Sequence, residues 1–388
     1  MTIAYSLPTV PFFKPALGDA EIEAVVDVMR SGWLTTGPGV RAFEKAFSEM
    51  LGPGIEAVAI NSATAGLHLA LEACGVGPGH EVLVPTLTFT ATAEVVHHLG
   101  AKAILVDVDP LTLTIDLDAA SRVVTKRTRA IMPVHFAGRG CPMGRVWDFA
   151  RRHDLHVVED AAHALPTRSE GLLIGAGQSA ACVFSFYANK TLTTGEGGML
   201  TTRDAAIAAR ARTMRCHGLD RDAFDRFRRN GAAWSYDVIE PGFKYNLTDI
   251  AAAIGIVQLK RAFALQAARQ RVAETYLACL SDLPLDLPAP AEPDDLHAWH
   301  IFPVRIRESA GIDRDAVIDA LAMRGIGSSV HYRPLHQMTH WSQSGAVGGR
   351  TFPAADRYFS GALSLPLYPD MSTFDTARVS DALHSILQ

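Results

Sequence analysis

The stretch FSFYANKTLTTGEGGML, residues 184–200, places one lysine between two apolar runs. The first run, Ala180–Phe186, has the composition of a buried strand. Lys190 follows that strand, and a glycine-rich turn, residues 195–198, follows the lysine. Glycine permits a tight turn and a close approach of the backbone to a ligand. Lys190 is therefore either a solvated loop residue or an amine that reaches into a cleft.

Strand-like and helix-like runs alternate around this stretch, from about residue 55 to residue 205. The strand-like runs are Ile55–Ile60, Glu81–Val84, Ala101–Val106, Arg129–Val134, Leu155–Val158 and Ala180–Phe186, and the amphipathic runs include Ala65–Ala73, Ala91–Leu99 and Met143–His153. The alternation predicts an α/β fold with a mostly parallel sheet that helices cover on both faces. Ligands bind at the carboxyl ends of the strands of such sheets, so the residues after each strand are the candidates for a site.

The pattern changes after residue 248. Thr248 can cap a long helix from Asp249 to about Leu280, and Asp249 suits the first turn of that helix. The next segments are a Pro/Asp-rich loop, a strand at Ile301–Arg305, a helix at Arg314–Arg324, a possible strand at Ser328–His331 and a final helix. We therefore expect a large α/β domain over residues 1–248 and a smaller α+β domain over residues 249–388.

The composition argues against several classes of protein. The chain has 388 residues, of which 48% are hydrophobic and 20% charged, as in ordinary globular proteins. A net charge of −5 without a basic run argues against nucleic acid and membranes as partners. The N-terminal sequence lacks signal-peptide features, and no apolar stretch approaches the roughly 18 residues of a membrane span. Five scattered cysteines without a CxxC pattern favour reduced thiols in the cytoplasm.

Four candidate positions follow four different strands. The segment from Asn61 to Thr64 opens a helix, whose free N–H groups and dipole attract an anion. Phe89 is an aromatic ring that can stack on a flat group. Asp160 ends a buried strand with a carboxylate, which needs a charged or donating partner. Lys190 becomes a nucleophile if burial lowers its pKa.

Each position taken alone also has an ordinary structural explanation. The helix start can be an ordinary N-cap, and Asp160 can cap the next turn. Phe89 can be a core side chain, and Lys190 can be a solvated surface lysine. His163 has no second ligand at a recognisable spacing, so no metal site is expected. The pair His297 and His300 can share a helix face, with a structural or substrate-adjacent role.

Taken together, the four positions match the requirements of pyridoxal 5′-phosphate (PLP). Its phosphate requires a helix N-terminus, and its ring requires a stacking partner. Its pyridinium nitrogen requires an anion, and its aldehyde requires a lysine. The sequence therefore predicts a PLP site at the carboxyl edge of the sheet.

The sequence also resembles the PLP-dependent nucleotide-sugar aminotransferases of the DegT/DnrJ/EryC/StrS type, which have the aspartate-aminotransferase-like fold (fold type I). The matching blocks are SGWLTTGP (31–38), NSATAGLHLAL (61–71), PTLTFTATAE (85–94), VVEDAAHA (157–164), FSFYANKTLTTGEGG (184–198) and PGFKYNLTDIAAAIG (241–255). The blocks HAWHIF (297–302), RGIGSSVHYRP (324–334) and SLPLYPDMST (364–373) resemble one subgroup. That subgroup aminates C4 of UDP-4-keto sugars, as the UDP-4-amino-4-deoxy-L-arabinose aminotransferases do.

The resemblance implies roles for individual residues at the cofactor. Lys190 would form the Schiff base, Asp160 would hold the pyridinium nitrogen, and Phe89 would stack on the ring, where close relatives often carry tryptophan. His163 would lie beside the ring, where many members carry glutamine. The residues implied to hold the phosphate are Ala63, Thr64 and Ser185.

The resemblance also implies contacts from the partner subunit and with the substrate. The segment PGFKYNLTD resembles one that reaches into the partner's site. Many members carry asparagine at the position of Lys244, whereas this chain has Asn246 two residues later. Asn246 is therefore the residue expected at the neighbouring phosphate. His331 and Arg333 are expected at the sugar or at a substrate carboxylate.

The implied activity is ping-pong transamination from an amino acid, L-glutamate, to C4 of a UDP-linked keto sugar. The enzyme would be a cytoplasmic homodimer with shared active sites, in the synthesis of a cell-envelope polysaccharide. One alternative is amination at C3 of a dTDP-linked deoxysugar, for an antibiotic or a surface glycan. Another is a regulatory protein on the same fold, but this chain lacks a DNA-binding module and a basic face. A related branch, which removes a sugar hydroxyl, carries histidine in place of the lysine, so Lys190 argues against it.

Overall fold

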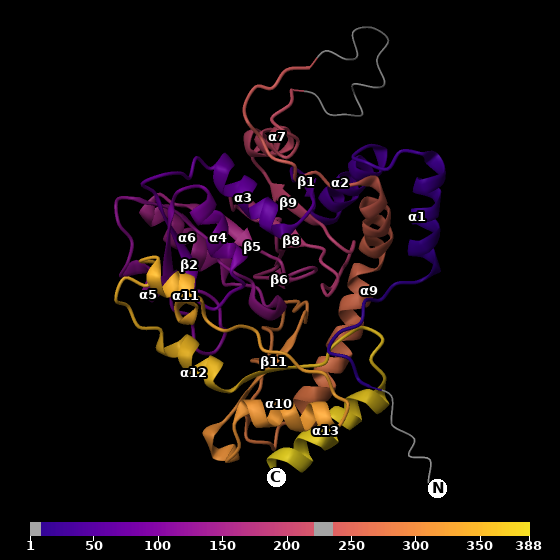
Figure 1. Cartoon of the computed structure of the whole chain (residues 1–388), viewed down its shortest axis with the longest axis vertical. Coiled ribbons are helices and arrows are strands. Elements are labelled where there is room, and N and C mark those ends of the chain that lie inside the picture. The colour runs from indigo at the N-terminus through magenta and orange to yellow at the C-terminus, as the bar shows by residue number, and fades with distance from the viewer. Residues whose placement is uncertain (1–8, 221–235) are drawn as a thin grey trace.

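A large twisted sheet organises the N-terminal part of the computed structural model, which describes residues 9–220 and 236–388 (Figure 1). Its strands are β1 (Glu56–Ile60), β2 (Glu81–Pro85), β3 (Lys102–Val106), β4 (Thr128–Ile131), β5 (His156–Asp160), β8 (Ala181–Ser185) and β9 (Gly198–Thr202). Their spatial order is β1-β9-β8-β5-β4-β2-β3, and all neighbours are parallel except at β9, which runs antiparallel to β1 and β8. The predicted α/β fold with a mostly parallel sheet is therefore confirmed.

Helices cover both faces of this sheet, which explains why its strands are apolar throughout. The helices are α2 (Pro38–Leu51), α3 (Ala63–Ala73), α4 (Ala91–His98), α5 (Leu117–Ser121), α6 (Met143–His153) and α7 (Ala205–Met214), whereas α1 (Asp19–Ser31) packs against a later helix. In β2, Val82 and Val84 join the core beneath α3, α4 and α7, whereas Leu83 joins the core beneath α2 and α6. Successive residues of a strand point to opposite faces, so each strand contributes to both cores.

A second, smaller sheet lies in the C-terminal part of the chain. It contains the antiparallel strands β10 (Leu285–Asp286), β11 (Phe302–Ile306) and β12 (Ala362–Leu365). The helices around it are α10 (Arg314–Met323), α12 (Pro353–Gly361) and α13 (Thr373–Leu387), whereas α11 (Thr339–Gln343) packs beside α4 through Trp341. A short hairpin of β6 (Arg168–Ser169) and β7 (Leu172–Leu173) stands apart from both sheets. The possible strand at Ser328–His331 is wrong, because this segment forms only an isolated bridge between Ser329 and Ser364.

The long helix α9 (Asp249–Cys279) runs from the large sheet to the small one (Figure 1). It packs against α1, α2 and α13, so it contacts elements from both parts of the chain. Thr248 caps it as predicted, because the Thr248 hydroxyl accepts a hydrogen bond from the backbone N–H of Ala251 (3.2 Å). The division into domains at residue 248 stays a prediction.

By length and composition alone, α9 is the one helix among the described residues that is apolar enough to cross a membrane. The expectation that no apolar stretch approaches the length of a membrane span is therefore wrong. The helix buries the polar side chains of Gln258, Gln266 and Arg269. Gln258 Nε2 donates to the carbonyl oxygen of Ala16 (3.0 Å), and Arg269 Nη1 donates to that of Trp299 (3.2 Å). These contacts are those of a helix packed inside the protein.

Candidate active site

A cavity of about 430 Å³ lies at the carboxyl ends of β5 and β8. Eight of the ten predicted site residues line it: Ala63, Thr64, Phe89, Asp160, His163, Ser185, Lys190 and His331. The cavity is where the parallel-sheet argument predicts a ligand. The two predicted residues that do not line it are Asn246 and Arg333.

One end of the cavity is the first turn of α3. The Ser62 hydroxyl caps this helix by accepting from the N–H of Ala65 (3.2 Å). The N–H groups of Ala63 and Thr64 belong to the first helical turn, whose amides have no partner within a helix. Ser185 ends β8 at the same end of the cavity, and its Oγ accepts from the N–H of Tyr187 (3.3 Å). Amides, hydroxyls and the helix dipole together suit a phosphate group.

The glycine turn after Lys190 brings these segments together. Gly195 has a φ of 80°, a left-handed conformation that favours glycine. A Cβ atom on Gly198 would lie 2.8 Å from the carbonyl oxygen of Phe184 and 2.9 Å from the nitrogen of Ala63. The close approach at Gly198 is therefore between protein segments, whereas Gly197 lines the cavity itself. The turn thus holds the start of α3 next to the end of β8.

Asp160 is buried at the end of β5, where two donors hold its carboxylate. Thr92 Oγ1 donates to Oδ2 (2.8 Å), and the backbone N–H of Ala162 donates to Oδ1 (3.1 Å). Burial raises the pKa of Asp160, although these hydrogen bonds and the charge of Lys190 act in the opposite direction. A buried carboxylate held in this way has a strong preference for a cationic partner.

Lys190 is half-buried, and it lines the cavity. Burial lowers the pKa of Lys190 to about 8, against the attraction of Asp160, which raises it. Its Nζ lies 3.5 Å from Nε2 of His300. Burial also lowers the pKa of His300 well below its usual value, so this imidazole is neutral. Lys190 therefore has the reactive environment that the sequence interpretation requires of a nucleophile.

His163 lies between these groups. Its Nε2 is 3.1 Å from the Tyr332 hydroxyl, and its ring centroid is 4.3 Å from that of His300. Burial lowers the pKa of His163 well below its usual value, so it is also neutral. Phe89 stands at the cavity with 58% of its surface exposed, and its ring centroid lies 6.0 Å from that of Tyr332. An exposed ring in this position is available to stack on a flat ligand.

The remaining predicted residues have different environments. His331 is buried at the cavity, and its Nδ1 lies 2.9 Å from the Ser364 hydroxyl. Arg333 is exposed and donates to the carbonyl oxygen of Gln337 (2.7 Å). Asn246 donates to the Thr36 hydroxyl (2.7 Å) and lines a separate cavity, beside Lys244. The roles of Asn246 and Arg333 stay predictions.

Sequence reasoning missed two residues at this site, Thr92 and Tyr332, and gave His300 only a structural or substrate-adjacent role. The expected helix face shared by His297 and His300 is wrong, because residues 297–300 are not helical. Thr92 lies within the quoted block 85–94, in the first turn of α4, where a hydroxyl can reach the neighbouring strand end. The available signal for His300 was a histidine inside an otherwise apolar run. Nothing local distinguishes Tyr332 from a core tyrosine.

The residues present fit PLP. The cavity joins a helix N-terminus, a buried carboxylate, a lysine of lowered pKa and an exposed ring. In addition, three buried polar atoms at the site have no hydrogen-bond partner among the described residues: Asn189 Oδ1, His163 Nδ1 and His300 Nδ1. Buried polar atoms without partners are uncommon, and a polar ligand satisfies them.

Comparison with known proteins agrees with this geometry. The model of the DegT/DnrJ/EryC1/StrS aminotransferase family matches residues 15–384. The spore coat polysaccharide biosynthesis protein SpsC of Bacillus subtilis (strain 168) is 41% identical over 380 residues, which cover 97% of each chain. The chain therefore belongs to the DegT/DnrJ/EryC1/StrS aminotransferase family.

Solved structures are similar over nearly the whole chain. The PMP form of Spr1654 from Streptococcus pneumoniae has a TM-score of 0.89 and 31% identity, covering 97% of this chain and 98% of that one. Helicobacter pylori PseC, an aminotransferase in pseudoaminic acid biosynthesis, has a TM-score of 0.89 and 26% identity, covering 98% and 99%. Spr1654 is also solved in a PLP form. This chain is a PLP-dependent sugar aminotransferase.

Proposed function

We propose that the enzyme transfers an amino group from L-glutamate to C4 of a UDP-linked 4-keto sugar. The observation that carries the reaction type is that Lys190 and Asp160, from two neighbouring strands, line one cavity with the start of α3. When bound, PLP supplies a carbonyl group that accepts the amino group and a ring that withdraws electrons. The C-terminal blocks that resemble C4-specific enzymes support the position and the nucleotide.

The residues of the cavity have different roles in the proposed reaction. Lys190 would hold the cofactor through its amine and, when freed by the amino donor, would move a proton on and off the reacting carbon. Its lowered pKa raises the fraction of free amine at neutral pH. Asp160 pairs with the pyridinium nitrogen, and Thr92 and Ala162 hold the carboxylate in place.

The other lining residues, together with Arg333 outside the cavity, position the cofactor and the substrates. The first turn of α3 and Ser185 hold the phosphate, while Phe89 and His163 contact the ring. His331 and Arg333 contact the sugar or the donor carboxylate. The donor and the acceptor use the same cavity in turn, so the kinetics are ping-pong.

The active unit is a homodimer in which Asn246 reaches the phosphate of the partner's cofactor. Support comes from the position of Asn246, which lies outside the cofactor cavity of its own chain. The five cysteines are all free thiols, which supports a cytoplasmic location. The product serves a cell-envelope polysaccharide, as the name of the relative SpsC suggests.

The experiment is an acceptor panel. The PLP-loaded protein is incubated with L-glutamate and UDP- or dTDP-linked 4-keto or 3-keto sugars, and the products are identified by mass and NMR. We expect amination at C4 of a UDP-linked sugar, and no product from the Lys190→Ala variant. Amination only at C3, or only of dTDP sugars, contradicts the proposed acceptor. Full activity of Lys190→Ala contradicts the proposed mechanism.

A further inference from the structure

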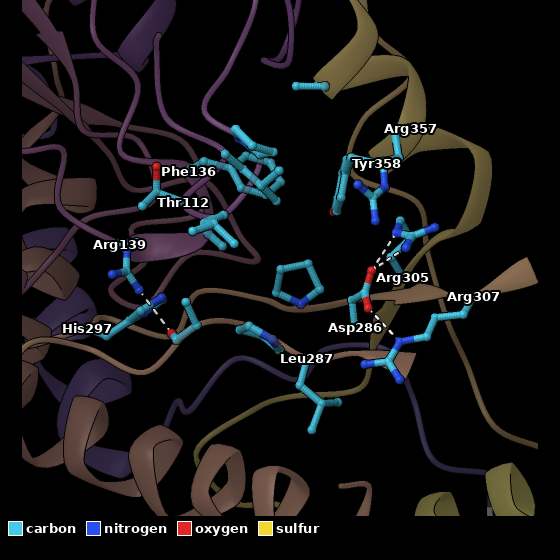
Figure 2. A pocket seen from close by; sticks show the side chains of 18 residues that line it. Thr112, Phe136, Arg139, Asp286, Leu287, His297, Arg305, Arg307, Arg357 and Tyr358 are labelled. Carbon is cyan, nitrogen blue, oxygen red and sulfur yellow. Dashed lines mark hydrogen bonds and ion pairs between the residues drawn. The ribbon is translucent and has the colours of Figure 1, made fainter. Parts of the chain in front are cut away.

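A second cavity, of about 450 Å³, lies between β11, α12 and the loop after β3 (Figure 2). It shares no lining residue with the cofactor cavity. The two are nevertheless neighbours, because Phe136 lines the second cavity and its ring centroid lies 6.4 Å from that of His163. The activity proposed above does not use this second cavity.

Four guanidinium groups line the cavity, and a single carboxylate accompanies them. Arg305, Arg307 and Arg357 lie on one side, and Arg139 lies on the other (Figure 2). The carboxylate is that of Asp286. His297, which also lines the cavity, is neutral, because burial and then Arg139 lower its pKa to about 3. The lining therefore carries four positive charges and one negative charge.

The carboxylate orients two of these arginines and leaves donors free. Arg307 Nε donates to Asp286 Oδ1 (2.6 Å), and Arg305 donates to Oδ2 from Nε (2.7 Å) and also from Nη2, so that its Nη1 is left without a partner in the described part of the chain (Figure 2). The two terminal nitrogens of Arg307 have no partner among the described residues, and neither has any nitrogen of the Arg357 side chain. A guanidinium whose Nε is fixed still presents its outer N–H groups, which suit the oxygen atoms of a phosphate.

The rest of the wall is apolar. Leu287, Leu113 and Phe136 line the cavity together with three prolines. Its volume resembles that of the cofactor cavity, about 450 Å³ against about 430 Å³. It therefore has room for a ring with a phosphate group attached. A cluster of free cationic donors next to an apolar wall is the chemistry that recognises an organic phosphate.

We propose that this cavity is a second binding site, which takes an organic phosphate. Arg305, Arg307 and Arg357 hold the phosphate, and the apolar part of the ligand packs against Leu287 and Phe136. The site is independent of the chemistry at Lys190.

The test is calorimetric titration of the PLP-loaded protein with inorganic phosphate and with phenyl phosphate. Loading with PLP fills the phosphate site at α3. The test variant is Arg307→Ala with Arg357→Ala. The matched control is Arg129→Ala with Arg324→Ala, which removes two exposed arginines that donate to backbone carbonyls outside both cavities. Both variants lose the same net charge, so long-range electrostatics are matched.

We expect saturable binding, with phenyl phosphate tighter than inorganic phosphate. In the test variant the affinity for each probe should fall by at least about tenfold, because charge-assisted hydrogen bonds are lost. In the control variant both affinities should stay within about twofold of the wild-type values. The proposal is overturned if neither probe binds saturably, or if the two double variants behave alike. Equal affinity for the two probes overturns the role of the apolar wall.

Discussion

Nζ of Lys190 lies 3.5 Å from Nε2 of His300, and the ring of His300 packs against that of His163. Burial lowers the pKa of Lys190 to about 8 and keeps both imidazoles neutral. At pH 7 a lysine with a pKa of about 8 is unprotonated in about one molecule in ten, against roughly one in two thousand for a solvated lysine. The partial burial of Lys190 at the cavity is therefore part of what makes it reactive.

Replacing His300 tests this relationship. His300→Ala opens the packing around Lys190 and admits water, so the pKa of Lys190 should rise toward its usual value. PLP uptake by the apo protein should then be slower at pH 7, by about tenfold for each unit of pKa rise. The measurement is the uptake rate against pH, followed by absorbance. The wild-type uptake rate should rise with a midpoint at about pH 8. The uptake rate of the variant should rise with a midpoint at higher pH.

The control for this experiment is His297→Ala. His297 is also buried in the same loop, but its ring stacks on Trp299 and its Nδ1 accepts from the Trp299 N–H (2.9 Å). His297→Ala should reduce stability without moving the pH midpoint of PLP uptake. An identical midpoint in His300→Ala and the wild type would contradict the role assigned to His300.

Asp160 depends on Thr92 in a similar way. The Thr92 hydroxyl donates to the buried carboxylate, and this hydrogen bond lowers the pKa of Asp160. Thr92→Val removes the donor with little change in shape, so the pKa of Asp160 should rise further. The carboxylate then becomes protonated at a higher pH, and the acidic limb of the pH–rate profile should shift upward. We expect kcat/KM to fall by about tenfold at neutral pH.

Thr88 provides the matched variant. Its buried hydroxyl makes a hydrogen bond to that of Thr92 (2.8 Å) but none to Asp160. Thr88→Val should therefore leave the acidic limb in place. If Thr92→Val and Thr88→Val shift it equally, the effect comes from packing and the assigned hydrogen bond is unimportant.

Asp249 has a second role besides the one predicted. It lies in the first turn of α9, as the sequence indicated. In the structure its carboxylate accepts hydrogen bonds from the backbone N–H groups of Gly37, Gly39 and Val40 (2.8–2.9 Å), at the start of α2. The side chain is buried, so it ties the two helices together.

Asp249→Ala leaves three amides without their acceptor and should lower the free energy of unfolding by about 3 kcal/mol. Urea denaturation measures this change. The control is Asp313→Ala, because Asp313 caps α10 at the surface through one hydrogen bond, to Ala316 (2.8 Å). Asp313→Ala should lower the free energy of unfolding by about 1 kcal/mol. Equal losses of unfolding free energy in the two variants would show that the contact between α9 and α2 adds no stability beyond that of an ordinary helix cap.

The predictable part of this site consists of residues that directly follow strands. Lys190, Asp160 and the start of α3 were identified because parallel strands bring their carboxyl ends to one edge, a rule that requires no tertiary detail. His300 and Tyr332 come from loops more than 100 residues away from Lys190 along the chain. Their positions depend on the docking of the C-terminal part, which no local periodicity encodes.

The same distinction applies to the fold. β5 and β8 have apolar runs bounded by polar residues, so their existence could be read from the sequence. The segment at Ser328–His331 has only one apolar residue, Val330, and it makes only one bridge to β12, at Ser364. Whether such a segment becomes a strand depends on a neighbour with a free edge, which is a tertiary property.

The shared active site leads to the last prediction, for mixed dimers. If Asn246 serves the partner's cofactor, then Lys190→Ala in one chain and Asn246→Ala in the other damage the same site of a mixed dimer, and the second site remains intact. Equal mixing after subunit exchange should restore about one quarter of the wild-type activity, since half of the dimers are mixed and each has one intact site. Mixing Lys190→Ala with Asp160→Ala should restore none, because both residues line the same chain's cavity. Recovery in neither mixture would mean that Asn246 acts within its own chain.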